Sequence, residues 1–390
     1  MVLVFGNGAS GKAAAELLRS EGRDVRVLDG DEPFPSDDVA GGVSLCVASP
    51  GVPLSHPWQV AARERGIKVV SELELGAERW RALGGRMIAV TGSKGKSSVV
   101  KLVAEALGGI PCGNYGRPLC DVALDHPTPL PWAVVEVSSF QMETTNLPPG
   151  TFEAAAILNL QEDHLDRHGS VEAYHALKRK LLGMATTGIV GGSRESTPED
   201  DARDAKILAG SYFDNDVLRE GGLCALALMR AAGLDLPRAA EAFAAFRPLP
   251  HRFETVWEEG GVKWVDDSKA TSLKALCAGV SRVSGRKILL VAGGLEKGDE
   301  PNSAISFLQN GVKKVYLIGR CAEKFFAAWH SAVACEMCGT LDVAVEAARR
   351  DAVSGDVVLL SPGAASFDQF NSYGERGDRF AELAKKGKTK

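Results

Sequence analysis

Apolar and polar residues alternate with two different periods along the first 85 residues. Four short segments rich in apolar residues have the length of β-strands, at residues 2–5, 25–28, 44–48 and 67–70. Two stretches between them, 12–20 and 58–65, repeat apolar residues at helical spacing. Strands that alternate with helices predict a parallel sheet covered on both faces. We therefore predict a first α/β domain over residues 1–85.

The same alternation resumes at residue 86. We predict strands at 87–90, 133–137 and 155–158, a Gly/Lys-rich loop at 91–98, and helices at 99–107, 223–232 and 239–246. The segment Arg247-Pro-Leu-Pro250 predicts a linker, because closely spaced prolines resist both helix and strand. A second domain is therefore expected over residues 86–247.

A third α/β pattern fills residues 248–390. Its predicted strands are 263–265, 288–292, 314–318 and 357–360, and its predicted helices are 273–280, 322–329 and 343–349. Three α/β domains in series are the predicted organisation. The chain of 390 residues supports this, because it is too long for one ordinary core.

Composition narrows the function classes. With 45% hydrophobic and 24% charged residues, the chain has the balance of a soluble globular protein. Its net charge of -5 argues against a general nucleic-acid or anionic-membrane surface, although a local Gly-rich loop can still bind phosphate. We expect small-molecule partners, no nucleic-acid or membrane partner, and a monomer.

The apolar runs and the cysteines both bear on the cellular location. No apolar run reaches the roughly 18 residues of a spanning helix, and no basic leader precedes the first strand. The eight cysteines are scattered, as in a reduced cytosolic protein, so we expect a cytoplasmic protein. Cys335 and Cys338 have CxxC spacing, but no second pair completes a zinc site, and we interpret them as incidental.

Two loops have the composition of phosphate-binding loops. The first, Gly6-Asn-Gly8-Ala-Ser-Gly11, follows a strand, opens a helix, and has Asp29 about twenty residues on, a dinucleotide-type pattern. Alone it suggests NAD, or a tight turn with no ligand. The second, Thr91-Gly92-Ser93-Lys94-Gly95-Lys96-Ser97-Ser98, lacks the first glycine of the longer Walker motif. It still supplies backbone N–H groups, a lysine for the β/γ-phosphates and a hydroxyl for Mg²⁺.

Polar residues follow the later predicted strands. Glu136 ends one strand, where a P-loop sheet commonly holds a metal-binding or water-binding acid. The segment from Asn159 to His168, with Asp163 and His164, suits either a metal or phosphate neighbour or a hydrogen-bonded loop. In the third domain, polar groups stand at His251-Arg252, at Asp266–Thr271, at Lys297 and at Ser366. Ligand sites in open parallel sheets gather at such strand ends.

Taken together, these segments resemble the Mur ligases, in the same order and over nearly the whole chain. The phosphate loop and Glu136-Val-Ser-Ser-Phe-Gln141 are shared with folylpolyglutamate ligases. Asp267-Ser-Lys-Ala-Thr271 and Ser366-Phe-Asp-Gln-Phe370 resemble the branch of the family that adds D-glutamate. The resemblance implies an N-terminal Rossmann-like sheet, a central P-loop ATPase-like domain and a C-terminal Rossmann-like domain.

The resemblance also implies roles for individual residues. The UDP end of UDP-N-acetylmuramoyl-L-alanine would contact the first domain and nearby residues, namely Gly8, Ala9, Ser10, Asp29, Ser49, Gly51, Asn114, Ser138 and Gln141. ATP would be bound by Gly92, Ser93, Lys94, Gly95, Lys96, Ser97 and Ser98, with Arg252 and Asp267 from the third domain. D-Glutamate would be held by Thr271, Lys297, Ser366 and Tyr373. The family's Asn-containing adenine motif is not recognisable at residues 211–224, so no adenine contact is assigned.

Two Mg²⁺ ions are implied in the same way. Ser97, Glu136, His164 and Lys178 would hold them, with Lys178 aligned to a lysine that the family carbamylates. The implied catalytic residues are Lys96, His164, Lys178 and Arg252. The expected reaction phosphorylates the substrate carboxylate with ATP, and the amine of D-glutamate then displaces phosphate from the acyl phosphate.

Other functions remain open from the sequence. A sister Mur ligase or a folylpolyglutamate synthase is the nearest alternative. An NAD-dependent oxidoreductase would rest on the first glycine loop and Asp29 but leaves the second loop, Glu136 and His164 unexplained. A non-catalytic ATP-gated binding module would leave the strand-end acids and histidine without a role.

Overall fold

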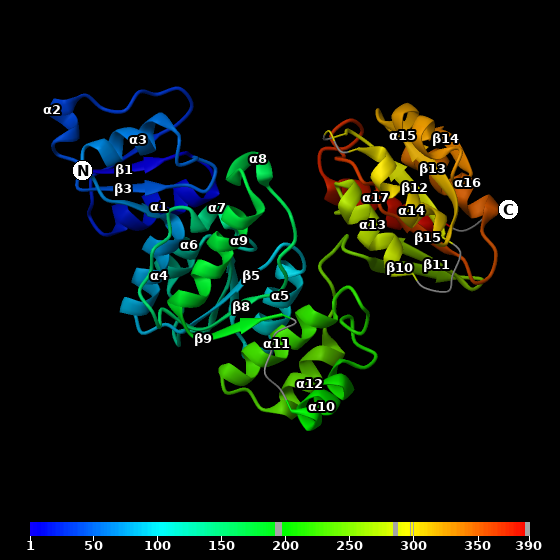
Figure 1. The fold of residues 1–390 in the computed structure, drawn as a ribbon, viewed down its shortest axis with the longest axis horizontal. Coiled ribbons are helices and arrows are strands. Elements are labelled where there is room, and N and C mark those ends of the chain that lie inside the picture. Colours follow the sequence, from blue (N-terminus) through cyan, green and yellow to red (C-terminus); the bar gives the residue numbers. More distant parts are fainter. Residues whose placement is uncertain (192–196, 284–287, 297, 299, 387–390) are drawn as a thin grey trace. The chain divides into compact units, whose positions relative to one another are not determined.

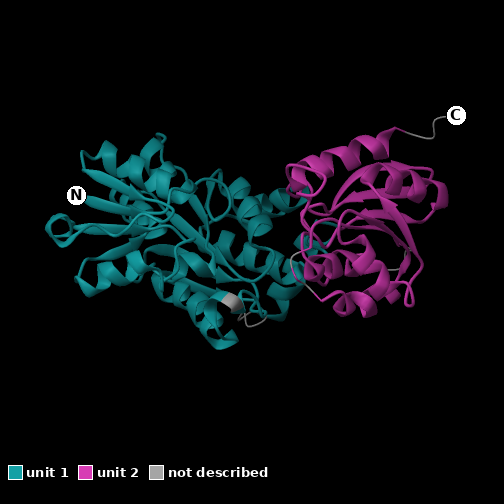
Figure 2. Cartoon of the chain, turned by 90° about the horizontal axis from the view of Figure 1, so that it is seen from above, with its two compact units in different colours: residues 1–214, 218–246 teal, residues 215–217, 247–390 magenta. Residues whose placement is uncertain are grey.

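The computed structural model describes residues 1–191, 197–283, 288–296, 298 and 300–386. The chain divides into two compact units (Figure 2). Unit 1 comprises Met1–Asp214 and Leu218–Phe246, and unit 2 comprises Asn215–Val217 and Arg247–Lys390. The described chain contains three largely parallel sheets with helices, which confirms the predicted α/β class. The domain boundary near residue 86 stays a prediction.

The first sheet of unit 1 has four parallel strands in the order β2-β1-β3-β4. Its neighbouring strands β1 and β3 are labelled in Figure 1. They are β1 (Val2–Phe5), β2 (Val25–Leu28), β3 (Leu45–Ala48) and β4 (Val69–Ser71). The accompanying helices are α1 (Ala9–Ser20), α2 (Asp37–Ala40), α3 (Pro57–Glu64) and α4 (Glu72–Ala82). Each predicted strand of this region forms within two residues of its expected bounds.

The second sheet of unit 1 has five parallel strands in the order β6-β7-β5-β8-β9. They are β5 (Met87–Thr91), β6 (Ile110–Gly113), β7 (Ala133–Glu136), β8 (Phe152–Ile157) and β9 (Ala185–Val190). The helices are α5 (Lys96–Leu107), α6 (Leu119–Asp125), α7 (Ser139–Met142), α8 (Leu165–His168), α9 (Val171–Lys180), α10 (Pro198–Leu208), α11 (Arg219–Ala231) and α12 (Leu236–Ala245), with the short 3₁₀ helix η1 (Leu181–Met184).

The two sheets of unit 1 share one hydrophobic core. Buried residues of the first sheet and its helices, such as Val4, Leu18 and Trp80, belong to the same cluster as Met87 and Val135 of the second sheet. Three polar contacts also join the two sheets. Ser71 Oγ lies 2.7 Å from Thr145 Oγ1, and the carboxylates of Glu72 and Glu74 accept the backbone N–H groups of Cys120 and Asn146. Unit 1 is therefore held together across both sheets.

Unit 2 contains a six-stranded sheet in the order β10-β11-β15-β12-β13-β14. The strands are β10 (Glu254–Glu259), β11 (Val262–Asp266), β12 (Ile288–Gly293), β13 (Val312–Ile318), β14 (Cys335–Gly339) and β15 (Val357–Leu360). The helices are α13 (Leu273–Ser281), α14 (Ile305–Gln309), α15 (Ala322–Trp329), α16 (Leu341–Asp351) and α17 (Tyr373–Lys385), with the 3₁₀ helix η2 (Pro301–Ala304). Separate buried clusters cover its two faces.

The sheet of unit 2 is parallel except for one antiparallel pair. β10 pairs antiparallel with β11, because a short Gly260-Gly261 turn, with both residues at positive φ, joins two consecutive strands. Among the described helices, none has the length and apolar character needed to cross a membrane.

Candidate active site

The phosphate loop lies between β5, in the middle of its sheet, and α5. Gly92 and Gly95 have φ values of 152° and 82°, a conformation that residues with a side chain rarely adopt. Gly95 is the N-terminal cap of α5, so the helix begins at Lys96 rather than at the predicted residue 99. The difference places Ser97 and Ser98 in the first helical turn. The free N–H groups of such a turn form an anion-binding site.

Asn159 fixes the shape of this loop from the neighbouring strand. Its Oδ1 accepts the backbone N–H groups of Ser93 and Lys94 at 3.1 and 2.9 Å, and its Nδ2 donates to the carbonyl of Lys94 at 3.0 Å. Ser93 Oγ lies 3.0 Å from the hydroxyl of Tyr174 in α9. From the sequence, Asn159 was only the first residue of a segment with two possible roles, and Tyr174 had none. The position of Asn159 just after β8, adjacent to β5, was the signal available.

Two lysines converge on the same loop. Lys96 Nζ donates to the carbonyls of Gly92 and Ser93 at 2.9 and 3.2 Å. Lys178 Nζ donates to the same Gly92 carbonyl at 3.0 Å and lies 4.7 Å from the centre of the Tyr174 ring. Lys178 is buried, and burial, with the charge of Lys96 next, lowers its pKa to about 7, while Asp163 and Glu136 oppose the shift. Lys178 is thus close to Lys96, Asp163 and Glu136.

Glu136 ends β7, beside β5, and is buried. Its Oε1 accepts a hydrogen bond from Asn114 Nδ2 at 2.6 Å, whereas its Oε2 is buried and has no hydrogen-bond partner. A buried carboxylate oxygen without a donor is unfavourable, and a hard cation such as Mg²⁺ would satisfy it. His164, in a left-handed conformation with φ 52°, is partly exposed and lies 4.8 Å from the Phe140 ring.

The metal-binding residues expected from the resemblance include few of the usual protein ligands, which are His, Cys, Asp and Glu side chains. In the described part of the chain, no three side chains of His, Cys, Asp or Glu form a group that could hold a metal ion. Glu136 and His164 supply two such groups. A carboxylate on Lys178 would add a third, and the residues present therefore fit Mg²⁺ only together with that modification.

The first glycine loop is closely packed. Gly6 has φ 90°, and a Cβ on Gly11 would overlap the carbonyl of Gly6 and approach Ser49 Oγ. Asp29 Oδ1 accepts the backbone N–H of Asn7 at 3.3 Å. Gly8 is the N-terminal cap of α1 and has no side chain that could bond to the helix end. Ala9 and Ser10 lie in the first turn of α1. These predicted substrate residues lie together, with Gly51 close in sequence to Ser49.

Three other predicted substrate residues have protein partners. Ser138 and Gln141 form a reciprocal capping box at the start of α7, with Ser138 N 2.9 Å from Gln141 Oε1. Asn114 is bonded to Glu136 by both its side chain and its backbone N–H. Any contact of these groups with substrate would share or replace those hydrogen bonds.

An open pocket of about 760 Å³ lies in unit 1, lined by the loop after β3 and by residues of α8, α9 and the end of α7. Loop residues from Pro53 to Ser55 form one side, and Glu143, Arg167 and Lys180 are among those on the other. Arg167 also donates to the carbonyl of Pro50 at 3.2 Å, and it pairs with Glu143. The pocket therefore borders the loop that contains Ser49 and Gly51.

In unit 2, Arg252 lies just before β10, and Asp267 lies just after β11. Asp267 follows β11 and accepts a hydrogen bond from Ser361 Oγ at 3.0 Å. Burial raises the pKa of Asp267 to about 7, although the Ser361 bond and the charges of Arg282 and Arg252 oppose the shift. Arg252 is thus near enough to Asp267 for their charges to interact.

The residues expected to bind D-glutamate are also in unit 2. Ser366 is buried, Thr271 is partly buried, and Tyr373 is partly exposed with Lys269 Nζ 3.9 Å from its ring centre. Lys297 lies outside the described residues. Buried Arg376, to which no role was assigned, donates to Ser268 Oγ and to the carbonyls of Ser268 and Ala364. It connects the segments that carry these residues.

Comparisons with known proteins agree with this architecture. The family description "Mur ligase, glutamate ligase domain" matches residues 251–363, and "Mur ligase middle domain" matches residues 128–194. Among solved structures, the MurF ligase from Thermotoga maritima in complex with ADP is 16% identical with a TM-score of 0.59, covering 98% of this chain and 93% of that chain. The UDP-N-acetylmuramate-alanine ligase MurC from the same organism has a TM-score of 0.54 at 16% identity, with 98% of each chain covered. These two likenesses show the fold.

Curated relatives are much closer in sequence. The UDP-N-acetylmuramoylalanine--D-glutamate ligase of Rubrobacter xylanophilus is 36% identical over 98% of this chain and 97% of its own. That of Frankia casuarinae is 35% identical over 97% and 93%, and that of Acidobacterium capsulatum is 34% identical over 98% and 95%. With relatives of this identity along nearly its whole length, the chain belongs to the Mur ligase family, among the UDP-N-acetylmuramoylalanine--D-glutamate ligases.

Proposed function

We propose that this protein is an ATP-dependent ligase that joins D-glutamate to UDP-N-acetylmuramoyl-L-alanine during peptidoglycan precursor synthesis. The observation that carries the proposal is the 34–36% identity, over nearly full length, to relatives with that name. The phosphate loop, with Lys96 and Lys178 on one carbonyl and Glu136 nearby, supplies the matching local chemistry. The eight cysteines are free thiols, which fits the expected cytoplasmic location.

The reaction has two steps. First, an oxygen of the L-alanyl carboxylate attacks the γ-phosphorus of ATP, the bond to the β–γ bridging oxygen breaks, and ADP and an acyl phosphate form. Next, the amine nitrogen of D-glutamate attacks the acyl carbon, the carbon–oxygen bond to phosphate breaks, and the nitrogen loses a proton. The products are the amide and inorganic phosphate.

Cationic side chains suit the first step. Phosphoryl transfer spreads negative charge over the transferred group, and fixed positive charges stabilise that charge where it develops. Lys96, at the start of α5, and Arg252 are the residues we propose for this role. Residues 92–98, together with Asp267, complete the proposed ATP contacts.

Mg²⁺, when bound, neutralises phosphate charge and orients the phosphate oxygens. We propose that Ser97, Glu136, His164 and carbamylated Lys178 would hold two such ions between them, in line with the unpartnered oxygen of Glu136. The lowered pKa of Lys178 supports the modification, since only a neutral amine adds CO₂. The neutral amine nitrogen forms a bond to the carbon of CO₂, one carbon–oxygen π bond opens to give the carboxylate, and one proton leaves the nitrogen. Counted from the ammonium form, two protons are released and a carboxylate replaces a cation.

Substrate binding is proposed on each unit separately. The first glycine loop, Asp29 and Ser49 suit the UDP end in unit 1, and the adjoining pocket with Arg167 and Lys180 suits an anionic ligand. In unit 2, Thr271, Ser366 and Tyr373, with Lys297, are the proposed D-glutamate residues, because a dicarboxylate requires hydroxyl and cationic donors.

A phosphate-release assay tests the proposal. The protein is supplied with ATP, Mg²⁺ and UDP-N-acetylmuramoyl-L-alanine, and D-glutamate is compared with L-glutamate, meso-diaminopimelate and L-lysine. We expect release only with D-glutamate, with the amide product detected by mass spectrometry. Preference for another amine would refute the substrate assignment, and NADH-dependent turnover instead would refute the ligase.

A further inference from the structure

Arg252 sits between two residues with unusual backbone conformations. His251 and Phe253 have φ values of 61° and 56°, whereas side-chain-bearing residues seldom adopt positive φ. Such strained residues persist only where surrounding contacts enforce them, and they cluster at functional sites. Here two such residues occur within three consecutive positions, one on each side of Arg252, and contacts must hold them in place.

Separate anchors hold the two flanking residues. Phe253 packs against the hydrophobic cluster that includes Val265 and Leu276, and the guanidinium of Arg282 lies 4.0 Å from its ring centre. His251 Nδ1 lies 2.7 Å from Oδ2 of the fully buried Asp266, the last residue of β11. The carbonyl of His251 accepts the backbone N–H of Lys269 at 3.0 Å. The backbone of Arg252 is therefore held from both ends.

Helix α17 closes over the His251–Asp266 pair. A Cβ on Gly377 would overlap His251 Nδ1 and approach Asp266 Oδ2 within 2.6 Å, so this position accepts only glycine without displacing the pair. The ring of His251 also faces Asp378 at 3.8 Å and the ring of Tyr373 at 6.2 Å. Its backbone N–H is 3.3 Å from Glu254 Oε2.

We infer that the His251–Asp266 pair is a positioning device for Arg252: it holds the strained backbone and thereby orients the guanidinium. The inference rests on the ATP role proposed above for Arg252. The role of His251 and Asp266 is to position Arg252, and neither is assigned a contact with the reacting atoms. The hydrogen bond to Asp266 also raises the pKa of His251 against the effect of burial, and Asp378 and Glu254 act in the same direction as Asp266.

A double-mutant cycle tests whether His251 acts through Arg252. We expect His251→Ala to lower kcat by roughly 10- to 100-fold, as misplacement of a reacting group does. In an Arg252→Ala background, the same change should cost less than about 2-fold, because coupled residues are not additive. Full additive losses would overturn the inference. His251→Asn, which tolerates positive φ and keeps an N–H donor, should recover most of the activity, and an Asn variant as poor as Ala would also overturn it.

Two glycine variants test the His251–Asp266 pair without changing its chemistry: one disturbs it and the other is the control. Gly377→Ala should reproduce the kcat loss of His251→Ala, while Gly374→Ala, three residues earlier in α17, should remain near wild type. The added Cβ at 374 would lie 3.8 Å from His251 Nε2, an ordinary contact, and both variants gain the same helix propensity. Wild-type kcat in Gly377→Ala would overturn the inference.

A readout besides activity separates this inference from the proposed function. In ¹⁵N NMR titrations, the pKa of the His251 ring should lie above its ordinary value in the wild type and return toward that value in Gly377→Ala. An unchanged ring pKa in Gly377→Ala would count against the pair. A wild-type protein inactive with every amine would overturn the proposed function, whereas an active protein with additive mutants would overturn only the positioning role.

Discussion

Lys96 and Lys178 both donate a hydrogen bond to the backbone carbonyl of Gly92, although they are far apart in the sequence. Burial penalises the charged form of Lys178, and repulsion from the neighbouring ammonium group of Lys96 adds to that penalty. The resulting pKa of about 7 makes the neutral amine abundant near neutral pH. A neutral amine is the form that reacts with CO₂.

Lys178→Ala should therefore remove most of the activity. A short carboxylic acid such as acetate should restore part of it by supplying the missing oxygen ligand. Arg179→Ala, at an exposed position in the same helix, is the matched control and should stay near wild type. Phosphate release with and without acetate is the measurement; full activity of Lys178→Ala would contradict the carbamate.

The same lysine predicts a pH dependence. Its pKa is lowered to about 7, so the fraction of neutral amine rises as the pH increases through 7 and is small below 6. Activity at limiting CO₂ should accordingly increase from pH 6 to pH 8, and added bicarbonate should raise the activity at the lower pH. Steady-state rates after preincubation at each pH test this. A rate that falls over this range, or that ignores bicarbonate, would argue against modification of Lys178.

Lys96 carries the proposed charge contact with the β/γ-phosphates. Lys96→Ala should lower phosphate release by about 10²-fold or more, the size of effect seen when a transition-state charge contact is removed. Lys101→Ala is the control, since that lysine lies further along α5 and pairs with Glu105 through an ordinary i,i+4 contact. Wild-type turnover in Lys96→Ala would place the ATP site elsewhere.

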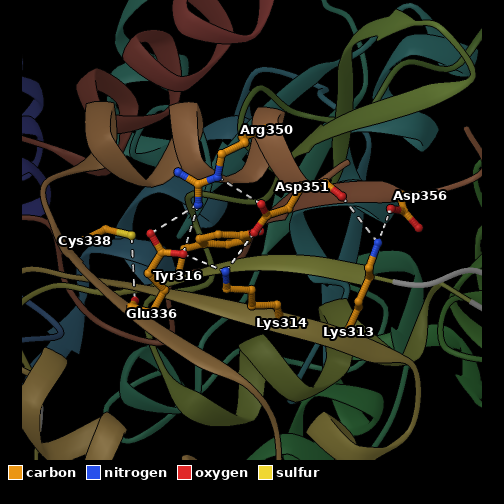
Figure 3. A network of polar contacts seen from close by, with 8 residues as sticks. All are labelled: Lys313, Lys314, Tyr316, Glu336, Cys338, Arg350, Asp351 and Asp356. Atoms are coloured by element: carbon orange, nitrogen blue, oxygen red, sulfur yellow. Dashed lines mark hydrogen bonds and ion pairs between the residues drawn. The ribbon is translucent and has the colours of Figure 1, made fainter. Parts of the chain in front are cut away.

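At the scale of elements, an ionic network connects an edge strand of unit 2 to a helix (Figure 3). Lys314 in β13 donates to Glu336 in β14 at 2.6 Å and to Asp351 at the end of α16 at 2.8 Å. Tyr316 donates to Asp351, and Arg350 contacts Glu336. The hydrogen bond from Lys314 is the largest cause that lowers the pKa of Asp351 to about 2. The network stabilises β14, whose own sequence is not strongly apolar.

Lys314→Met should weaken this edge. We expect a loss of about 1–3 kcal/mol in the local opening free energy, typical of hydrogen bonds to charged groups. Because the pKa of Asp351 is lowered, the stabilisation is present above about pH 4 and is lost as the pH falls through about 2. Hydrogen exchange of β13 and β14 amides measures it, with Lys324→Met, in an exposed pair with Glu296, as the control. Equal protection in both variants would contradict the role of the network.

At the scale of the whole molecule, the contact between the two sheets of unit 1 contains a buried acid. Glu72 starts α4, and its Oε1 accepts the N–H of Cys120 at 2.8 Å while Oε2 has no partner. Burial raises the pKa of Glu72 to about 7. Below about pH 4.5 the acid is neutral in both folded and unfolded chains, so its effect on stability appears only as the pH rises.

The stability of unit 1 should fall as the pH increases from about 4.5 to 7. The loss is at most roughly 3–4 kcal/mol, because burial raises the pKa of Glu72 from its ordinary 4.5 to about 7. Glu72→Gln should remove this dependence and be at least as stable as the wild type at pH 8. Glu78→Gln, at an exposed position in α4, should leave it unchanged. Thermal unfolding at pH 5 and pH 8 is the measurement, and identical slopes in the wild type and Glu72→Gln would contradict the assignment.

The sequence by itself determined the buried strands and the order of the functional segments. β1, β12 and β15 are continuous apolar runs, which are typical of strands in a parallel sheet with two covered faces. The four strands that the pattern did not predict, β6, β9, β10 and β14, are the edges of their sheets. Edge strands are partly exposed, so they need no continuous apolar run and leave little signal. The glycine loops were recognisable because they depend on local backbone geometry.

Tertiary structure decided which side chains meet. Sheet order places β7 and β8 on either side of β5, and that arrangement brings Glu136 and Asn159 to the phosphate loop. Arg376 contacts Ser268, and Gly377 of α17 packs against His251, in each case across more than 100 residues of chain. His251 and Asp266 are closer in sequence, but they meet only because the antiparallel pairing of β10 with β11 brings the start of β10 beside the end of β11. No periodicity records such contacts. The burial that lowers the pKa of Lys178 likewise exists only once α9 packs on the loop, because desolvation is a property of the folded environment rather than of the residue.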